Sequence, residues 1–286
     1  MVGHSDRGAA FLTMQSIDHL DAGIIQRGLA ARGETVHVEV LQRCASTNGV
    51  LLLREPAEGP VLLLADEQTA GRGRRGRRWH ACPGAAIMFS LRWEFDAGSA
   101  QLGGLSLAVG VSIAKTLHGL GARDVGLKWP NDLLASMAKG GAKLGGILIE
   151  TRSSASRMAA VVGVGLNFRR MPGLDIRLKR RIASLDESID PLPARNEVAI
   201  ALAADLVPRL RLFSTAGFQP FKAQWEALHS NQGEPMRIRT SHGRIIAGIA
   251  DGVAADGALL LRTRGGVRSV HSGTVVRTAP PRGAAA

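Results

Sequence analysis

The sequence of 286 residues has little of what covalent or metal-based chemistry needs. Its two cysteines, Cys44 and Cys82, lie far apart, which fits neither a CxxC pair nor a disulfide framework and favours a reducing, cytoplasmic compartment. The eight histidines form no HExxH or similar pair, so a metal site built by the protein alone is not expected. No GxSxG motif is present and neither cysteine has the surroundings of a nucleophile, so covalent catalysis is not favoured.

Membrane and secretory segments are also missing. No apolar run reaches roughly 18 residues, and the N-terminal stretch has no apolar h-region. Only 4% of the residues are aromatic, and no pattern of interleaved aromatic and basic side chains suggests a nucleic-acid platform. We therefore expect a soluble cytoplasmic protein without a membrane partner.

Core-forming residues and positive charge are what the sequence has in quantity. Hydrophobic residues make up 45% and charged residues 21%, as in ordinary globular proteins. The length suits one large and one small domain at roughly 150 residues per domain. The net charge of +12 favours an anionic partner, although an arginine-rich proteome would also give a basic surface.

Hydrophobic periodicity divides most of the chain into a large α+β region over 16–232 and a small β-rich region over 233–280. A flexible leader (1–15) is expected before them and a loose tail (281–286) after them. A helix over 16–33 opens the large region, with Ser16 as N-cap and Gly33 as stop. The small region has short alternating segments separated by Gly and Asp, typical of a small β-barrel. The other expected elements are strands over 36–44, 61–65, 85–93, 125–135, 142–152 and 158–170, and helices over 102–121, 196–213 and 217–229.

The stretch AGRGRRGRRWH, residues 70–80, holds five arginines and three glycines between Gly71 and Arg78. Glycine lets the backbone approach a ligand closely, and arginine offers forked, permanently charged donors to phosphate or carboxylate oxygens. No GK[ST] follows, so the stretch is not a P-loop. The pattern alone leaves open a phosphate site, a nucleic-acid contact and a solvated run of charge.

The same arginine loop is expected to be mobile without a ligand. Ordering each residue costs about 1–2 kcal/mol, and five clustered arginines repel one another. A hydrogen bond to a charged group returns only about 1.5–3 kcal/mol. We therefore predict that the loop closes when an anion binds.

Four further motifs place polar residues or glycines near the ends of expected strands: STN (46–48), KWPND (128–132), KLGGILIE (143–150) and GVGLNF (163–168). The third sets Lys143 before paired glycines, and the fourth leaves room for a planar ligand and carries Asn167 at the end of its strand. Each also has a structural explanation. The first two fit a helix cap or a turn, the third an exposed lysine, and the fourth close helix–strand packing.

In their order along the chain, the five motifs resemble the biotin–protein ligase family. The resemblance covers roughly residues 16 to 280 and is most specific in GRGRRGRRW. It implies an α+β fold, in which a mixed β-sheet with flanking helices, similar to class II tRNA synthetases, precedes an SH3-like C-terminal domain. It also implies two steps. Biotin and ATP give biotinyl-5'-adenylate, and a lysine of a biotin carboxyl carrier protein, as in acetyl-CoA carboxylase, then takes the biotinyl group.

The resemblance implies site residues as well. Lys143 and Arg74 are the expected catalytic residues, Lys143 between the biotin carboxylate and the α-phosphate, and Arg74 as a clamp on the adenylate. Magnesium is expected to arrive with ATP, with Asp132 as a contact and no dedicated metal site. The implied biotin contacts are Ser46, Thr47, Asn48, Gln68, Arg72, Gly73, Arg74, Lys143 and Gly145. The implied ATP or adenylate contacts are Arg74, Arg75, Arg77, Trp79, Lys128, Asn131, Asp132 and Asn167.

The chain departs from the family pattern in two places. The segment before the strand at 36–44 is too short for the winged helix-turn-helix of bifunctional members, so a monofunctional ligase without a DNA partner is expected. No aromatic residue between Phe168 and Phe213 is present to stack on adenine, and Ile182 is the candidate to cover it.

Two other functions compete with this one. A lipoate–protein ligase or octanoyltransferase shares the fold and modifies a similar carrier lysine, but lacks the arginine loop. A basic nucleic-acid-binding module would use residues 71–78, although no recognition helix is visible. Nucleic-acid binding would weaken steeply with salt, whereas a ligase would gain thermal stability from biotin and ATP.

Overall fold

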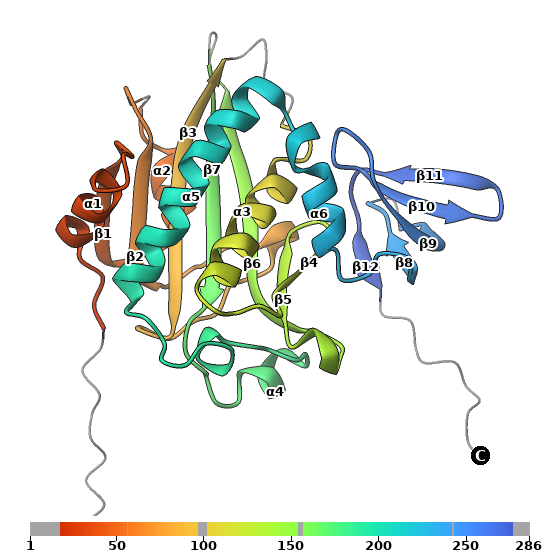
Figure 1. Ribbon diagram of the computed structural model, residues 1–286, viewed down its shortest axis with the longest axis horizontal. Helices are drawn as coiled ribbons and strands as arrows, with labels where there is room; N and C mark the ends of the chain where they lie inside the picture. Colours follow the sequence, from red (N-terminus) through yellow and green to blue (C-terminus); the bar gives the residue numbers. More distant parts are fainter. Residues whose placement is uncertain (1–17, 56, 97–101, 154–156, 242, 277–286) are drawn as a thin grey trace, which may run out of the picture.

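A computed structural model describes residues 18–55, 57–96, 102–153, 157–241 and 243–276. Figure 1 shows a large sheet with helices packed on it and a smaller sheet beside it. The expected leader, the proposed cap Ser16 and the expected tail lie outside the described residues. No helix in the described part of the chain is long and apolar enough to cross a lipid bilayer.

The large sheet has seven strands in the order β1-β2-β3-β7-β6-β5-β4. β1 and β2 run parallel and every other neighbouring pair is antiparallel, so the sheet is mixed, as predicted. The expected strand at 125–135 is a hairpin instead, because Pro130 has no N–H to donate and a turn separates its halves. The strands are β1 (His37–Cys44), β2 (Val61–Gln68), β3 (Ala86–Asp96), β4 (Gly126–Lys128), β5 (Asp132–Ala135), β6 (Ala142–Ser153) and β7 (Arg157–Asn167).

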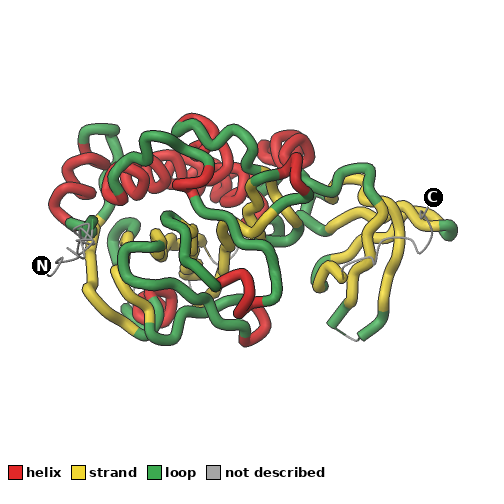
Figure 2. Tube along the Cα trace, turned by 90° about the horizontal axis from the view of Figure 1, so that it is seen from below, coloured by secondary structure: helices red, strands yellow, loops and turns green. Residues whose placement is uncertain are grey.

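Helices cover the two faces of this sheet unequally. Figure 2 shows most of them gathered on one side, where α1 (Ala22–Ala30), α3 (Leu105–Gly119), α5 (Arg195–Ala216) and α6 (Lys222–Leu228) lie. Leu62 and Leu64 of β2 join the main hydrophobic core on that side. Leu63 points the other way and joins a smaller cluster with Leu51 of α2 (Thr47–Leu52). β2 is therefore covered on both faces, as its continuous apolar run predicts.

The expected helices differ from the observed ones mainly at their ends. The predicted cap Ser16 is wrong, because α1 begins after Asp21, whose side chain accepts a hydrogen bond of 2.7 Å from Ile24 N. Gly33 lies in the turn after α1, with φ 79°. The expected helix at 217–229 is a 3-10 turn (Gln219–Phe221) followed by α6, and a short helix α4 (Leu174–Leu178) was not predicted.

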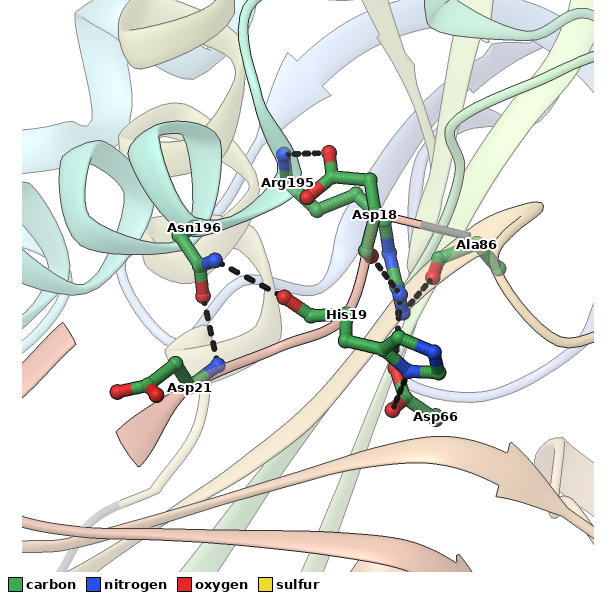
Figure 3. A network of polar contacts seen from close by, with 7 residues as sticks. All are labelled: Asp18, His19, Asp21, Asp66, Ala86, Arg195 and Asn196. Atoms are coloured by element: carbon green, nitrogen blue, oxygen red, sulfur yellow. Dashed lines mark hydrogen bonds and ion pairs between the residues drawn. The ribbon is translucent and has the colours of Figure 1, made fainter. Parts of the chain in front are cut away.

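A buried arginine fastens the start of the described chain to the sheet (Figure 3). Arg195, the first residue of α5, is fully buried. Its guanidinium donates to Asp66 Oδ1 at 2.7 Å, to Asp18 O at 2.7 Å and to Ala86 O at 3.0 Å. The side chain thus joins the segment before α1 to β2 and β3, and its charge is balanced by Asp66.

The small region forms a separate antiparallel sheet in the order β11-β10-β9-β8-β12, the predicted SH3-like domain. Its contact with the large domain includes Trp129 Nε1, which donates to Gly257 O at 3.2 Å, and Val253 N, which donates to Glu226 Oε1 of α6 at 3.0 Å. Its strands are β8 (Pro235–Arg239), β9 (Ile245–Val253), β10 (Leu259–Thr263), β11 (Gly266–Val270) and β12 (Thr274–Val276).

Candidate active site

A cavity of about 1140 Å³ lies on the α2 side of the large sheet and extends to the small domain. The arginine loop, the turn between β4 and β5, the segment after α4 and β12 surround it. All but three of the site residues implied by the sequence line this cavity. They are Ser46, Thr47, Asn48, Gln68, Arg72, Gly73, Arg74, Arg75, Arg77, Trp79, Lys128, Asn131, Asp132 and Lys143.

The STN motif is anchored at one end of the cavity by a chain of hydrogen bonds. It stands at the start of α2, where Thr47 N donates to Gln68 Oε1 at 2.9 Å. Ser90 Oγ lies 2.7 Å from Thr47 Oγ1 and 2.5 Å from Asn48 Oδ1. Because a hydroxyl carries one hydrogen, Ser90 donates to the Asn48 carbonyl and accepts from Thr47. The buried polar groups are thereby paired and held in one orientation.

The same chain of bonds continues to the arginine loop. Asn48 Nδ2 donates to Glu150 Oε2 at 2.9 Å, and the other oxygen of Glu150 lies 2.7 Å from Arg72 Nη2. Gly163 stands beneath Asn48, since a Cβ at that position would lie only 2.3 Å from Asn48 Oδ1. A glycine is therefore required on β7 for Asn48 to lie against the sheet.

Trp79 occupies the room that the sequence assigns to a planar ligand over GVGLNF. A Cβ at Gly165 would lie 2.6 Å from Trp79 Cε2, so the indole packs directly on the backbone of β7. The indole Nε1 is buried without a hydrogen-bond partner. The glycines of this strand therefore accommodate Asn48 and Trp79, two side chains of the protein itself.

At the other end of the cavity, Lys143 of β6 forms an ion pair with Asp132 of β5. The Lys143 side chain is 16% exposed, and its burial lowers its pKa while Asp132 raises it. Arg74 Nη1 donates to Asn131 Oδ1 at 3.3 Å next to this pair. Burial and the neighbouring Arg75 lower the pKa of Arg74.

The cavity as a whole is strongly cationic. Ten lysine and arginine residues line it, and among the described lining residues Asp132 is the only carboxylate. A basic, partly buried pocket of this kind favours an anionic ligand such as a phosphate chain.

Several arginines of the loop have partners within the protein. Arg78 Nη2 donates to Thr69 O at 2.7 Å, and Arg75 Nη1 donates to Thr274 Oγ1 of β12 at 2.5 Å. Arg72 and Arg78 also form a β-bridge with each other. The expectation that only an anion could order the loop overlooks these partners. Its closure on a ligand stays a prediction.

Comparison with known proteins identifies the family. A family model described as "Biotin/lipoate A/B protein ligase family" matches residues 40–167, and "Biotin protein ligase C terminal domain" matches residues 233–277. The chain is 35% identical to the bifunctional ligase/repressor BirA of Escherichia coli, over 83% of this chain and 73% of that protein. The chain belongs to the biotin protein ligase family.

Other members of the biotin protein ligase family support the assignment. The biotin--[acetyl-CoA-carboxylase] ligase of Mycobacterium tuberculosis is 34% identical, over 84% of this chain and 88% of that protein. The biotin protein ligase of Aquifex aeolicus, solved in complex with biotin and ATP, superimposes with a TM-score of 0.70 at 27% identity, covering 85% of this chain and 99% of that one.

Three implied residues of this ligase lie outside the cavity lining. A Cβ at Gly145 would lie 2.8 Å from Gly165 O, so this glycine allows close strand packing. Asn167 is buried, and its Nδ2 donates to Lys143 O and Ala183 O at 3.2 and 2.9 Å, so its expected ATP contact is not supported. Ile182 pairs with Lys143 in a β-bridge and does not line the cavity either, which removes support for its role over adenine.

Sequence reasoning missed three residues at this site of the ligase. Ser90 and Glu150 complete the hydrogen-bond chain, and a lone serine inside the apolar run AAIMFSLRW was the available signal for the first. Arg180 lines the cavity where Ile182 was expected, and its burial lowers its pKa. The sequence has three consecutive basic residues at 179–181, but periodicity does not show which of them face a cavity.

Proposed function

We propose that this ligase activates biotin with ATP as biotinyl-5'-adenylate and transfers the biotinyl group to one lysine of a biotin carboxyl carrier domain. The observation that carries the proposal is the Lys143–Asp132 pair beside Arg74, in a cationic cavity whose far end is a fixed network of amides and hydroxyls. The Aquifex aeolicus relative, described in complex with biotin and ATP, supports the choice of substrates.

The network around the STN motif suits the ureido ring of biotin. That ring offers one carbonyl acceptor and two N–H donors. Thr47, Gln68 and Asn48 present both hydroxyl or amide donors and carbonyl acceptors at this end of the cavity. Arg72 and Ser46 line the same end. Because these groups are already oriented by Ser90 and Glu150, binding requires little reorganisation.

Lys143 suits the opposite end of biotin. The biotin carboxylate must approach the α-phosphate of ATP, and these two anions repel each other. A cation between them stabilises the charge that develops as the carboxylate oxygen bonds to phosphorus and pyrophosphate leaves. Asp132 holds the Lys143 ammonium in place and opposes the loss of its proton.

Arg74 is proposed to hold the adenylate against escape and hydrolysis. Arg75, Arg77 and Lys128 are proposed to contact phosphate oxygens. Trp79 and Asn131, which line the same cavity, are proposed on the nucleotide side.

Magnesium is proposed to enter bound to the phosphates of ATP. In the parts of the chain that the structure describes, no three His, Cys, Asp or Glu side chains form a group that could hold a metal ion. Asp132 is the one carboxylate of the described lining that could contact the ion at the phosphates, as a hard oxygen ligand.

Mass spectrometry tests the two steps separately. With ATP, magnesium and biotin but no acceptor, the purified chain is expected to accumulate biotinyl-5'-adenylate. With an apo biotin carboxyl carrier domain added, one lysine gains the mass of biotin and AMP is released. A carrier with that lysine replaced by arginine is the control. Labelled carrier without any adenylate, or adenylate that never labels the carrier, would contradict one of the two steps.

A further inference from the structure

A second cavity of about 360 Å³ adjoins the active site at the junction of the two domains. It lies between the N-terminal part of α3, the turn that links β4 to β5, and the turn that links β9 to β10. Arg74 and Asn131 line both cavities. The 3.3 Å hydrogen bond between these two side chains is therefore part of the boundary between the cavities.

The outer walls of this second cavity are formed by close backbone contacts between the domains. A Cβ at Gly103 would lie 2.7 Å from Asp256 O, and one at Gly257 would lie 2.5 Å from Gly104 Cα. Trp129 Nε1 donates to Gly257 O at 3.2 Å. Contacts this close leave the two domains little freedom here, so the cavity is a built feature of their junction.

The charges along the cavity change from its mouth to its inner end. Asp256 and His271 lie at the mouth, with side chains 50% and 70% exposed and Oδ2 and Nδ1 3.2 Å apart. Asp256 is the only carboxylate among the described lining residues. Arg74 lies where this cavity meets the active site, since it lines both cavities. This change of charge suits a ligand that enters as a cation and reacts as a neutral group. The Asp256 carboxylate attracts the cation, and the positive charge of Arg74 disfavours the cationic form near the active site.

The transfer step needs such a route. Once the adenylate is bound in the active-site cavity, the nucleophile has to reach the acyl carbon by a path that the nucleotide does not block. A volume of about 360 Å³ is room for roughly a dozen waters at about 30 Å³ each, which is ample for one extended lysine side chain with water around it.

We propose that this cavity admits the acceptor lysine of the carrier domain, with Asp256 guiding its ammonium group at the mouth. This inference rests on the function proposed above. The deprotonated amine attacks the acyl carbon of the mixed anhydride and forms the amide C–N bond. The C–O bond to AMP breaks, and its electron pair leaves on the AMP phosphate. The two protons that the ammonium group loses pass to water in the cavity.

Kinetics of the two half-reactions test the proposal with three variants. Asp256→Asn removes the charge but keeps an acceptor for Ala258 N, which Asp256 Oδ1 binds at 3.0 Å. Asp256→Lys reverses the charge, and Leu102→Trp fills the cavity from the turn that precedes α3. Asp251→Lys is the matched control, because Asp251 lies on β9 of the same domain, 43% exposed and outside the lining of both cavities.

For Asp256→Lys, we expect the KM for the apo carrier domain to rise about tenfold, the scale of electrostatic steering, and less for Asp256→Asn. Leu102→Trp should lower kcat of transfer at saturating carrier. All three should retain the wild-type rate of biotin-dependent ATP–pyrophosphate exchange, which needs no carrier, and Asp251→Lys should match wild type in both assays. Thermal unfolding of each variant establishes that it is folded.

The proposal is wrong if the folded variants transfer biotin to the carrier with wild-type kcat and KM. It is equally wrong if exchange falls as much as transfer, since the cavity would then serve the first step. Absence of biotin-dependent exchange in the wild-type chain would instead contradict the proposed function itself. That result can be told apart from the two results above, in which the wild type still catalyses exchange.

Discussion

Lys143 and Asp132 form an ion pair along the antiparallel β5–β6 ladder because Gly146, the residue of β6 that faces Asp132, has no side chain. Asp132 is paired with Gly146, whereas Lys143 is paired with Leu134 two residues further along β5. A Cβ at Gly146 would lie 3.2 Å from Lys143 Nζ and 3.8 Å from Asp132 Oδ1. The second glycine of KLGGILIE, Gly146, thus gives the lysine side chain room to reach the carboxylate.

Lys143→Ala should lower the rate of biotin-dependent pyrophosphate exchange about 10²–10³-fold, as the loss of one preorganised charge does in other enzymes. The free energy of unfolding should fall by less than about 2 kcal/mol, because Asp132 is 30% exposed and keeps contact with water. Lys115→Ala, at an exposed position on α3, is the control. Exchange at the wild-type rate in Lys143→Ala would contradict a role of Lys143 in forming the adenylate.

Exchange should also depend on pH through Lys143. Burial lowers the pKa of Lys143 below its ordinary value of 10.5, so the cation is lost, and kcat/KM falls, at a lower alkaline pH than for an exposed lysine. Asp132 raises this pKa, so Asp132→Asn should move the alkaline limb to still lower pH. Asp251→Asn is the control. If kcat/KM of Asp132→Asn falls at the same alkaline pH as that of the wild type, the result would contradict an effect of Asp132 on the pKa of Lys143.

Gly163→Ala should weaken biotin binding, because the added methyl group has to displace Asn48 Oδ1 from a position 2.3 Å away. We expect the KM for biotin to rise by about tenfold and the unfolding free energy to fall by about 1–3 kcal/mol, as overpacking does. Gly59→Ala adds the same methyl group where no atom lies within 4 Å. Equal KM values for biotin in Gly163→Ala and Gly59→Ala would show that Asn48 does not take part in biotin recognition.

Arg74→Gly should release biotinyl-5'-adenylate into solution and label lysines of bystander proteins such as serum albumin. The physical reason is the loss of the guanidinium at the boundary of the cavity, where it binds Asn131. Arg123→Gly, at an exposed position after α3, is the control. Labelling that stays confined to the carrier domain would exclude a clamp role for Arg74.

Stability should fall in mild acid because of His229 at the junction of the domains. Burial lowers the pKa of His229 to about 4, and its ring stacks on Trp225 with centroids 4.4 Å apart. Between the ordinary pKa of 6.5 and about 4, the unfolded chain binds a proton that the folded chain does not. The free energy of unfolding therefore falls by up to about 1.4 kcal/mol per pH unit as the pH drops through this window.

Urea unfolding at several pH values between 6.5 and 4.5 measures this slope. His229→Gln removes the titrating group, so its unfolding free energy should fall less steeply with pH than that of the wild type, whatever its absolute stability. Parallel slopes would show that His229 does not titrate in this window.

The arrangement of strands was largely predictable from the sequence, because continuous apolar runs such as VLLLA and long alternating segments leave few alternatives. A turn at Pro130 was expected, but the separate antiparallel strand β5 that follows it and the late start of α1 were not resolved, since apolar periodicity extends across both boundaries. The Asp21 cap shows why: the helix start depends on one side-chain hydrogen bond, which Ser16 could have made equally well by residue type.

The lining of the candidate site was predictable where a motif carries charged residues of its own, as in the arginine loop and Lys143. It was not predictable where a residue acts through its neighbours. Glu150 joins Asn48 to Arg72 across 102 and 78 positions of sequence, respectively, and only strand pairing brings these residues together. Asn167 looked like a ligand because it ends a glycine-rich strand, yet its Nδ2 bonds to backbone carbonyls in the fold.

The most direct test of the central claim is ATP–pyrophosphate exchange measured side by side with biotin and with lipoate. It isolates formation of the acyl-adenylate and distinguishes the two substrates used within this fold. We expect exchange with biotin, little or none with lipoate, and loss of the biotin signal in Lys143→Ala. Exchange with lipoate alone would contradict it.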